Sequence, residues 1–164
     1  MIFVVLGTQD KEFKRLIDII KIFLDETNSK EDIIIQYGNT KYDYSVFDSF
    51  SNVKCFDFIS PDDFDKYMID AEVVVTHAGV GSIIHGLKKN KKLIVVPRLK
   101  KYKEHVNDHQ LQITDNFAKK GYIIALEDGE KLQNVLKKAK DFAPKKFVSN
   151  NEKFNDELEK IINK

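Results

Sequence analysis

The sequence predicts an α/β fold, a Rossmann-like parallel sheet with helices on both faces. Short apolar runs typical of buried parallel strands alternate with segments in which apolar residues recur at helical spacing. Strands that alternate with helices require right-handed crossovers, and these place helices on both sides of a parallel sheet. The 164 residues suffice for one domain with a proper core, whereas a second full domain would be cramped. We therefore expect residues 1–164 to form a single domain.

The first half of the chain opens with the apolar run Met1 to Leu6. This run lacks a basic flank and is too short for a signal peptide or a membrane span, so we expect a strand. Ser60-Pro61-Asp62-Asp63 predicts a helix start, because a capping hydroxyl, a proline and acidic side chains favour that end of a helix. The predicted elements are, in order, a strand at 2–6, a helix over Phe13 to Leu24, strands at 33–36 and 53–58 flanking a polar loop at 38–52, and a helix that carries Phe64, Tyr67 and Met68 inward.

The second half continues the alternation of strands and helices. Its predicted elements are a strand at 72–76, a helix over Val80 to Leu87, a strand at 93–96, a helix over 107–120, a strand at 122–126 and a helix over Leu132 to Ala139. After the break at Ala143-Pro144, a final amphipathic helix is expected at 150–163. Its apolar stripe would pack on the sheet or dock on a partner, and packing is the favoured interpretation.

The composition excludes several classes of protein. The 27 basic and 26 acidic residues leave a net charge of +1, so the overall charge does not favour nucleic acid as a partner. A single cysteine, Cys55, excludes an internal disulfide and a multi-cysteine metal cluster, and we expect it to be a buried strand residue. A local group of lysines is expected to be solvated surface, with a face for anionic lipid or an acidic partner as the alternative. Its members are Lys88, Lys89, Lys91, Lys92, Lys100, Lys101 and Lys103.

No apolar run approaches the roughly 18 to 20 residues that a membrane-spanning helix requires. Any association with a membrane is then expected to be peripheral or to come through a partner. The chain is expected to be cytoplasmic.

Glycines are concentrated where a ligand of this fold would bind. Ligands of such folds collect at the carboxyl ends of strands near a topological switch point, which selects the loops after the first, fourth and fifth strands. Gly7-Thr8-Gln9 and Gly79-Val80-Gly81-Ser82 follow two of these strands, so each would present backbone N–H groups and a positive helix dipole to a diphosphate. The alternative, left open, is that the second glycine pair only permits a tight turn, since Ile84 replaces the last glycine of a GxGxxG fingerprint.

All four histidines lie between His77 and His109. His77 ends a predicted strand, so we expect its ring to look into the cleft and to act there in acid–base chemistry or orientation, with a structural histidine as the alternative. No pair has the H-E-x-x-H spacing and no cysteine accompanies them, so no metal site is expected. Asp63-Phe64-Asp65 matches a D-x-D metal motif only superficially, because its place at a helix start favours interaction with the helix dipole.

Asn107-Asp108-His109-Gln110 is a run of four hydrogen-bonding side chains at the start of a predicted helix. Such a run suits a ligand rich in hydroxyl groups. The alternative is a capping segment, with Asn107 or Asp108 as N-cap and the other side chains solvated.

Four motifs together resemble a known family. They are Val5-Leu6-Gly7-Thr8-Gln9, Thr76 to Ser82, Val95-Val96-Pro97-Arg98 and Asn107 to Gln110, and the resemblance runs from residue 1 to about residue 125. The chain resembles the C-terminal, donor-binding half of GT-B glycosyltransferases of family 28. Within that family it is similar to the short single-domain subunits, namely the soluble catalytic subunit of the eukaryotic dolichyl-diphosphate GlcNAc second-step transferase and bacterial polysaccharide-biosynthesis counterparts.

The resemblance implies a place for each part of the donor. Gly7, Thr8 and Gln9 would approach the donor diphosphate. Where many relatives have a glutamate that binds the ribose hydroxyls, this chain has His85. The remaining nucleotide contacts would come from Gly79, Val80, Gly81, Ser82 and Arg98, and the donor-sugar contacts from Asn107, Asp108, His109 and Gln110.

The resemblance also implies an activity. The chain would be the donor-binding subunit of a two-component inverting glycosyltransferase that moves a sugar from a UDP-sugar to a lipid-linked acceptor in polysaccharide or glycan biosynthesis. Full GT-B enzymes use two halves, so the acceptor would bind a second, membrane-anchored protein subunit, which would hold this chain at the membrane. Backbone amides and helix dipoles would stabilise the departing UDP without an obligatory metal or other cofactor. The alternatives are a non-catalytic accessory that stabilises or activates a transferase partner, and a self-sufficient nucleotide-sugar enzyme such as an epimerase.

Overall fold

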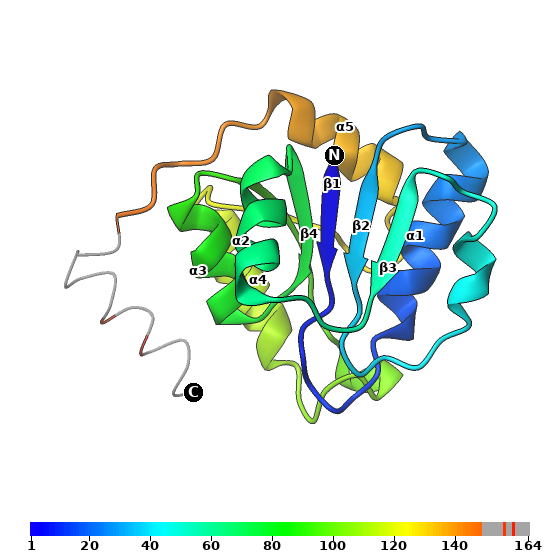
Figure 1. Ribbon diagram of the computed structural model, residues 1–164. Coiled ribbons are helices and arrows are strands. Elements are labelled where there is room, and N and C mark those ends of the chain that lie inside the picture. Colours follow the sequence, from blue (N-terminus) through cyan, green and yellow to red (C-terminus); the bar gives the residue numbers. More distant parts are fainter. Residues whose placement is uncertain (149–155, 157–158, 160–164) are drawn as a thin grey trace.

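The computed structural model describes residues 1–148 together with Asp156 and Glu159 (Figure 1). In this part of the chain, six parallel strands form one sheet in the order β3-β2-β1-β4-β5-β6. The α/β fold class predicted from the alternating apolar runs is confirmed. The strands are β1 (Ile2–Val5), β2 (Ile33–Gln36), β3 (Val53–Phe56), β4 (Val73–His77), β5 (Lys92–Val96) and β6 (Ile124–Ala125).

Helices cover both faces of the sheet, as Figure 1 shows. Side chains alternate between the two faces of a strand, so β1 contributes Ile2 and Val4 to one core and Phe3 and Val5 to the other. α1 and α5 pack on the first core, whereas α2, α3 and α4 pack on the second. The helices are α1 (Lys14–Thr27), α2 (Pro61–Asp70), α3 (Val80–Lys88), α4 (His109–Lys119) and α5 (Leu132–Asp141).

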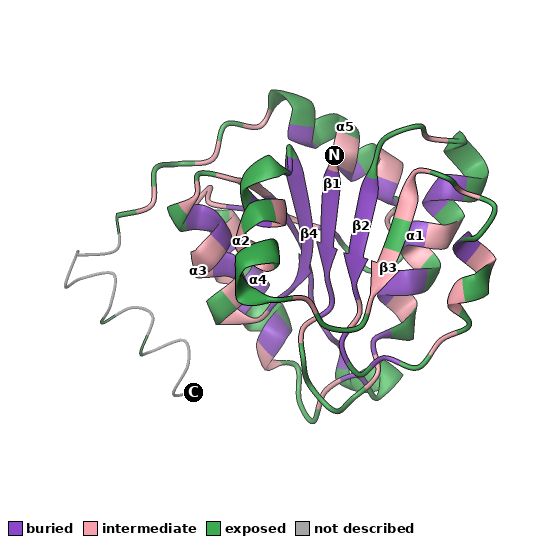
Figure 2. Ribbon diagram, in the orientation of Figure 1, coloured by how far each residue is buried: buried purple, intermediate pink, exposed green. Residues whose placement is uncertain are grey.

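The centre of the sheet is its most buried part (Figure 2). β1, β2 and β4 are buried along their whole length, whereas the edge strand β3 is only partly buried. This is the pattern of a parallel sheet with both faces covered. Cys55 lies on β3 and is half-buried, less than expected, because β3 pairs only with β2. Burial still raises the pKa of its thiol to about 11.

The topology reverses between β1 and β4. β1 pairs with β2 on one side and with β4 on the other, so that Ile2 lies between Ile33 and Val73. The helix after β1 packs on one face of the sheet and the helix after β4 packs on the opposite face. A crevice between such diverging connections is where doubly wound folds bind ligands. The loops selected from the sequence therefore lie at the ends of three neighbouring strands, β1, β4 and β5.

Several element boundaries differ from the sequence-based expectation. β6 is shorter than the predicted strand at 122–126, and α4 begins two residues later than expected, at His109. The helix expected at 150–163 lies outside the described residues, apart from Asp156 and Glu159. Within residues 1–148, two short 3-10 helices were not predicted: η1 (Tyr44–Phe47), inside the polar loop, and η2 (Lys100–Tyr102), before α4. None of the helices in the described ranges is long and apolar enough to cross a bilayer.

The local group of lysines does not form one surface. Lys91 and Lys92 lie before or at the start of β5, whereas Lys101 follows its end. The Lys91 ammonium donates to the carbonyls of Ile69 and Ala71, and the Lys92 ammonium donates to those of Ala139 and Lys140. Lys89 pairs with Asp65, and Lys101 pairs with Asp128. Strand β5 thus separates the lysines, and several of them close helix ends or pair with acids.

Candidate functional site

The candidate site lies where β1 and β4 end. Gly7 follows β1, Gly79 follows β4, and both contact the ring of His77. A β-carbon added to Gly7 would lie 2.6 Å from the imidazole, and one added to Gly79 would lie 2.2 Å from it. One ring therefore contacts both glycine turns, and only glycines allow so close an approach. The structure brings the two predicted phosphate cradles together.

In the loop after β1, residues 7–12 (the β1 loop), the backbone carbonyl groups and the backbone N–H groups differ in their hydrogen bonding. The carbonyls of Leu6, Lys11 and Glu12 accept hydrogen bonds from Arg98, and the Thr8 carbonyl accepts one from Asn39. In contrast, no group among the described residues accepts a hydrogen bond from the backbone N–H groups of residues 7–12. A row of N–H groups without acceptors is suited to bind an anion.

The start of α3 adds a second set of free donors. Its N-cap is Gly79, which has no side chain to cap the helix, and the first helical bond is donated by Ile83 to the Gly79 carbonyl at 3.1 Å. The N–H groups of Val80, Gly81 and Ser82 therefore have no acceptor within the described part of the chain. With the positive end of the helix dipole they favour an anionic ligand at this point.

His77 is a buried, neutral ring. Its side chain lies at the carboxyl end of β4, as expected, but the residue is only 7% exposed. Burial, and after it the charge of Arg98, lowers the pKa of His77 to about 4, while a hydrogen bond with the Val5 carbonyl acts in the opposite direction. The ring separates Gly7 from Gly79 and does not project into open space. This position and this pKa suit a structural wedge better than the acid–base role expected from the sequence.

Arg98 is also removed from the surface. It was expected to bind the nucleotide, but it is fully buried, with its Cζ 4.7 Å above the Phe13 ring. Its guanidinium faces the carbonyls of the β1 loop at 2.6 to 3.4 Å. The nearby Glu104 carboxylate binds Arg15 through two hydrogen bonds and accepts a third from the Leu99 N–H. Arg98 therefore supports the site from beneath.

The polar run before α4 is largely engaged in holding its own loop. Asn107 accepts a hydrogen bond from the His109 N–H, and Asp108 accepts one from the Lys100 N–H. Gln110 is buried and accepts a hydrogen bond from the Arg98 N–H at 3.1 Å. Asp108 is the N-cap residue of α4, as the capping alternative expected, but its side chain makes no cap hydrogen bond, and Gln110 is buried instead of solvated. Among the described residues, the His109 imidazole forms no hydrogen bond and the side-chain amide nitrogens of Asn107 and Gln110 have no acceptor, so these groups are left for a ligand.

His85 points from α3 toward α2. Its Nε2 lies 3.0 Å from an oxygen of Asp65, and the other Asp65 oxygen accepts a hydrogen bond from Lys89 at 2.9 Å. These hydrogen bonds, the one from Lys89 first, lower the pKa of Asp65. His85 thus links α3 to α2. Asp65 joins that link, whereas Asp63 caps the start of α2 together with Ser60.

Sequence reasoning missed several residues that shape the site. The Gly38 turn packs on the β1 loop so closely that an added β-carbon would lie 2.2 Å from the Gly7 carbonyl oxygen. Thr40 accepts a hydrogen bond from the Phe13 N–H. Gly86 lets α3 approach β5, since a β-carbon there would lie 2.5 Å from Leu93. The turn directly after β2 was a local signal for Gly38, whereas nothing local signals the burial of Glu104.

Within the described residues, no three histidine, cysteine, aspartate or glutamate side chains lie close enough to hold a metal ion. A pocket of about 310 Å³ lies at the ends of β5 and β6, and Pro97, Leu99, Asp108 and Leu126 contribute to its lining. The pocket places the start of α4 beside open space.

Comparison with known sequences identifies relatives of the chain. The family model for the glycosyltransferase family 28 C-terminal domain matches residues 1–164. The UDP-N-acetylglucosamine transferase subunit ALG13 of Candida albicans is 29% identical over 123 residues, which cover 69% of this chain and 41% of that protein. The subunit of the same name from Debaryomyces hansenii is 31% identical over 116 residues, covering 69% and 46%. The chain therefore spans less than half the length of these curated relatives.

Solved structures share the fold. An NMR solution structure of ALG13 superposes with a TM-score of 0.62 at 23% identity, covering 96% of this chain and 94% of that one. The crystal structure of CalG4, the calicheamicin glycosyltransferase, superposes with a TM-score of 0.63 at 14% identity, covering 98% and 37%. At these identities the likeness concerns the fold alone. The predicted fold, one half of a GT-B glycosyltransferase, is confirmed.

Proposed function

The chain belongs to the glycosyltransferase family 28 C-terminal domain family, and from that membership we propose that it is the donor-binding subunit of a two-component inverting glycosyltransferase. It moves a sugar from a UDP-sugar to a lipid-linked acceptor in polysaccharide or glycan biosynthesis. The observation that supports this most directly is the row of N–H groups at residues 7–12, beside the uncapped start of α3, that have no acceptor in the described part of the chain. Backbone donors at a helix start bind diphosphates through hydrogen bonds and the helix dipole.

In this proposal the chain holds the donor and stabilises the leaving group. Negative charge grows on the diphosphate as the bond from the sugar to UDP breaks, and donors that are already oriented lower the barrier to that step. The N–H groups of residues 7–12 and 79–82 meet this charge, so no metal ion is part of the proposal. The His109 imidazole faces the donor sugar.

A second protein subunit completes the active site. It is anchored in the membrane, binds the lipid-linked acceptor and holds this chain at the cytoplasmic side of the membrane. The word subunit in the names of the ALG13 relatives supports an assembly of more than one chain. The buried His77, with its pKa of about 4, would be a poor general base at neutral pH. The proposal therefore places the general base on the partner.

Substitution of Gly81 tests where the donor binds. Gly81 is exposed, and an added β-carbon would contact nothing within 4 Å. Gly81→Glu places a carboxylate at the α3 N-terminus, where it favours the helix but repels a diphosphate. We expect the Kd for UDP, measured by calorimetry, to rise by about tenfold or more, which corresponds to roughly 1.4 kcal/mol. The neutral, nearly isosteric Gly81→Gln variant is the control and should lose much less affinity.

An activity assay separates the proposal from an accessory role. The chain is expressed with its membrane partner, and UDP release from a panel of UDP-sugars is followed with wild type and Gly81→Glu, with and without EDTA. Loss of transfer in the variant and no effect of EDTA are expected. Full activity of Gly81→Glu, without any thermal shift of the wild-type chain by UDP, would instead identify a non-catalytic accessory.

A further inference from the structure

Arg98 is an unusual residue to find beneath a ligand loop. It is the largest fully buried side chain in the described part of the molecule, and its Nε has no hydrogen-bond partner there. Burial lowers its pKa to about 10, with Glu104 acting in the opposite direction, so the guanidinium is charged at neutral pH. A buried charge costs stability unless it is paired and hydrogen-bonded. The energetic cost of this cation suggests a role beyond packing.

The hydrogen bonds of Arg98 determine which way the β1 loop turns its amides. Nη2 donates to the Leu6 carbonyl at 2.9 Å, and Nη1 donates to the Lys11 carbonyl at 2.6 Å. In a planar trans peptide, the C=O of one residue and the N–H of the next point in opposite directions. Because Arg98 holds the Leu6 and Lys11 carbonyls inward, the N–H groups of Gly7 and Glu12 face away from it. The cation thereby orients both ends of the loop.

The charge beneath the loop is not fully neutralised. Glu104 lies near Arg98, but its carboxylate forms two hydrogen bonds with Arg15, at 2.8 and 2.9 Å. Two guanidinium groups thus share one buried carboxylate. The second acid near Arg15, Asp128, lies 3.7 Å away and also pairs with Lys101. The excess positive charge lies beside the Leu6 carbonyl, directly below the start of the loop.

We propose that Arg98 is a positioning residue for the donor diphosphate, which it never touches. It turns the Gly7 and Glu12 amides toward the phosphates through the Leu6 and Lys11 carbonyls, and it adds positive potential below them. This inference rests on the proposed function, because it assumes that a nucleoside diphosphate binds at residues 7–12. It also accounts for why an arginine predicted to bind the nucleotide is instead buried.

The test compares Arg98→Lys and Arg98→Met with wild type, using the full chain and three probes: UDP, uridine and inorganic pyrophosphate. A lysine keeps the charge but is a point donor without the rigid fork that reaches two carbonyls. We expect the Kd for UDP and pyrophosphate to rise by about tenfold in Arg98→Lys and further in Arg98→Met, while the Kd for uridine changes less than about twofold. Leu132→Ala, a buried change in α5, is the control for lost stability alone.

A second readout needs no ligand. In NMR spectra of the free protein, the amide resonances of Gly7 and Glu12 should shift in both variants and stay unchanged in Leu132→Ala. The pKa of His77 should rise in Arg98→Met, because the charge of Arg98 contributes to its low value. If Arg98→Met does not fold, Arg98→Lys and Leu132→Ala still provide the comparison.

Two results would overturn the inference: equal weakening of UDP and uridine binding in Arg98→Lys, or unchanged Gly7 and Glu12 resonances. If wild type binds neither UDP nor pyrophosphate, the proposed function fails, and with it the role of Arg98 toward a diphosphate. In that case the free-protein spectra still decide whether Arg98 orients the loop. The two failures are therefore distinguishable.

Discussion

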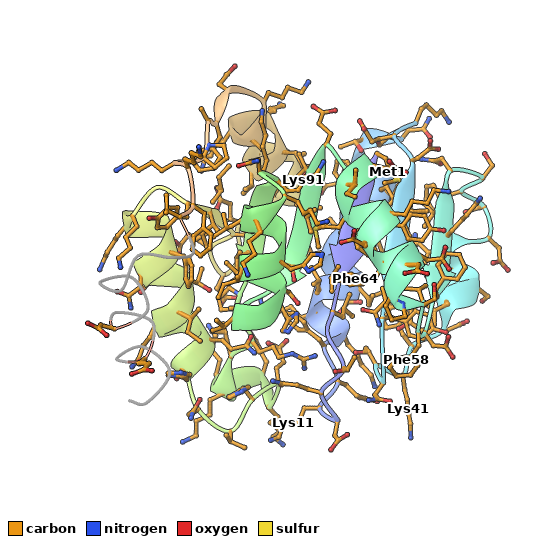
Figure 3. All side chains as sticks on the ribbon, turned by 60° about the vertical axis from the view of Figure 1, so that its left-hand side comes forward. Met1, Lys11, Lys41, Phe58, Phe64 and Lys91 are labelled. Atoms are coloured by element: carbon orange, nitrogen blue, oxygen red, sulfur yellow. The ribbon has the colours of Figure 1, made fainter. Side chains whose placement is uncertain are left out.

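At the amino edge of the sheet, where the strands begin, Lys91 and Lys92 donate to carbonyls that end α2 and α5. At the carboxyl edge, where the strands end, Arg98 donates to carbonyls of the β1 loop. Figure 3 shows Met1 and Lys91 at one end of the molecule and Lys11 at the other. Basic side chains bind backbone oxygen at both edges. At the amino edge, the lysines bind the last carbonyls of two helices. At the carboxyl edge, the buried Arg98 binds carbonyls of the β1 loop, so that N–H groups of the loop face outward.

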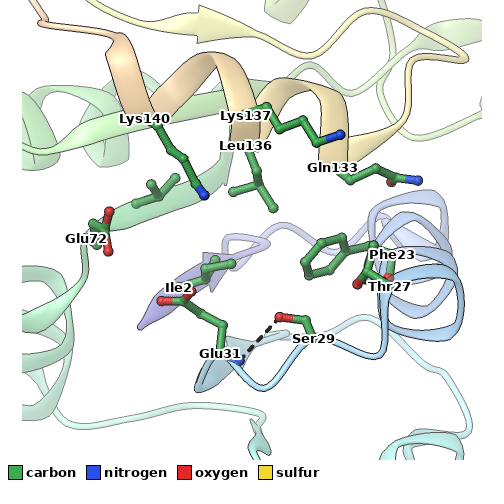
Figure 4. Close-up of a pocket in the computed structure, with 11 residues that line it drawn as sticks. Ile2, Phe23, Thr27, Ser29, Glu31, Glu72, Gln133, Leu136, Lys137 and Lys140 are labelled. Carbon is green, nitrogen blue, oxygen red and sulfur yellow. Dashed lines mark hydrogen bonds between the residues drawn. The ribbon is translucent and has the colours of Figure 1, made fainter.

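The largest difference between the edges is the polarity of their backbone, and two pockets of equal volume, one at each edge, do not reveal it. A pocket of about 310 Å³ lies at the amino edge between α1 and α5 (Figure 4). Thr27 and Lys140, from the last turns of these helices, contribute to its lining, as does Glu31, which pairs with the N-terminal ammonium. Helix C-termini carry negative partial charge, and the lining contains Glu31 and Glu72 as well as Lys137 and Lys140, so this pocket is less suited to a diphosphate than helix N-termini are. A cavity of similar volume at the carboxyl edge lies beside helix N-termini.

The largest expected effect comes from matched glycine substitutions at the two edges. Gly38 and Gly121 both have positive φ, +57° and +76°, and lie at the carboxyl and amino edges respectively. Alanine in either position costs about 1 to 2 kcal/mol of conformational energy. In Gly38→Ala the new β-carbon also meets the Gly7 backbone oxygen at 2.2 Å, whereas in Gly121→Ala it meets the flexible Lys145 side chain at 3.3 Å. Overpacking adds about 1 to 3 kcal/mol for Gly38→Ala alone.

Urea unfolding of both variants measures this difference. Gly38→Ala should lower the free energy of unfolding by about 2 to 5 kcal/mol and Gly121→Ala by about 1 to 2 kcal/mol. Equal losses would show that the carboxyl edge tolerates an extra atom as well as the amino edge does. The close contact of the two turns would then have no special part in the site.

The second effect depends on pH and arises only at the carboxyl edge. The pKa of His77 is about 4 in the folded chain and 6.5 ordinarily. Between these values the unfolded chain binds a proton that the folded chain does not, so stability is fully present above pH 6.5 and is lost as the pH falls toward 4. The loss amounts to roughly 3 kcal/mol. His77→Gln should remove this slope.

The measurement is urea unfolding at several pH values between 7 and 4.5. His105→Gln, which leaves His77 in place, is the matched control and should keep the wild-type slope. An unchanged slope in His77→Gln would mean that the ring is not held neutral between the two glycine turns. The wedge role of His77 would then be refuted.

The fold could be predicted because its signals are local. β2 and β4 were predicted from continuous runs of isoleucine and valine, which are typical of strands buried on both faces. The start of α2 was predicted from Ser60 and Pro61, whose side chains act within one turn. β6 is shorter than predicted, because pairing with β5 extends only over Ile124 and Ala125, and pairing is not encoded in a local pattern.

The site was predicted less completely because its contacts are distant in sequence. The glycine turns were identified, since glycine itself signals unusual backbone geometry. The interior role of Arg98 was not, because three of the four carbonyls that it binds precede it by 86 to 92 positions in the sequence. Glu104 is buried for the same kind of reason, through Arg15. A charged side chain in a motif gives no local sign of whether it faces the ligand or supports the loop from beneath.

The third effect is a difference in the free energy of unfolding between substitutions at two glycines, one packed against His77 and the other at the start of the helix only. Gly79 and Gly81 lie two positions apart at the α3 start, but only Gly79 contacts the His77 ring. Gly79→Ala should lower the free energy of unfolding by about 1 to 3 kcal/mol through overpacking. Gly81→Ala should be neutral or raise it by up to about 1 kcal/mol, because alanine favours a helix. Thermal unfolding of the two variants side by side checks this order, and a reversed order would contradict the ring contact.

The smallest effect is expected at the amino edge. The Lys92 ammonium donates to the carbonyls of Ala139 and Lys140, at 2.8 and 2.7 Å, and so closes the end of α5. Lys92→Met keeps the length of the side chain but removes these bonds. We expect a loss of about 1 kcal/mol in the free energy of unfolding. The affinity for UDP should be unchanged, because the end of α5 that Lys92 closes and the β1 loop lie at opposite edges of the sheet.

Lys88→Met is the matched control, because the Lys88 ammonium has no hydrogen-bond acceptor among residues 1–148. Its removal should change neither the free energy of unfolding nor the Kd for UDP. A rise of more than about twofold in the Kd for UDP with Lys92→Met would contradict the separation of the edges. It would mean that the positive charges at the amino edge affect the binding of UDP at the carboxyl edge. The orientation of the amides, and with it the place of Arg98, would then be only part of what makes the carboxyl edge the binding edge.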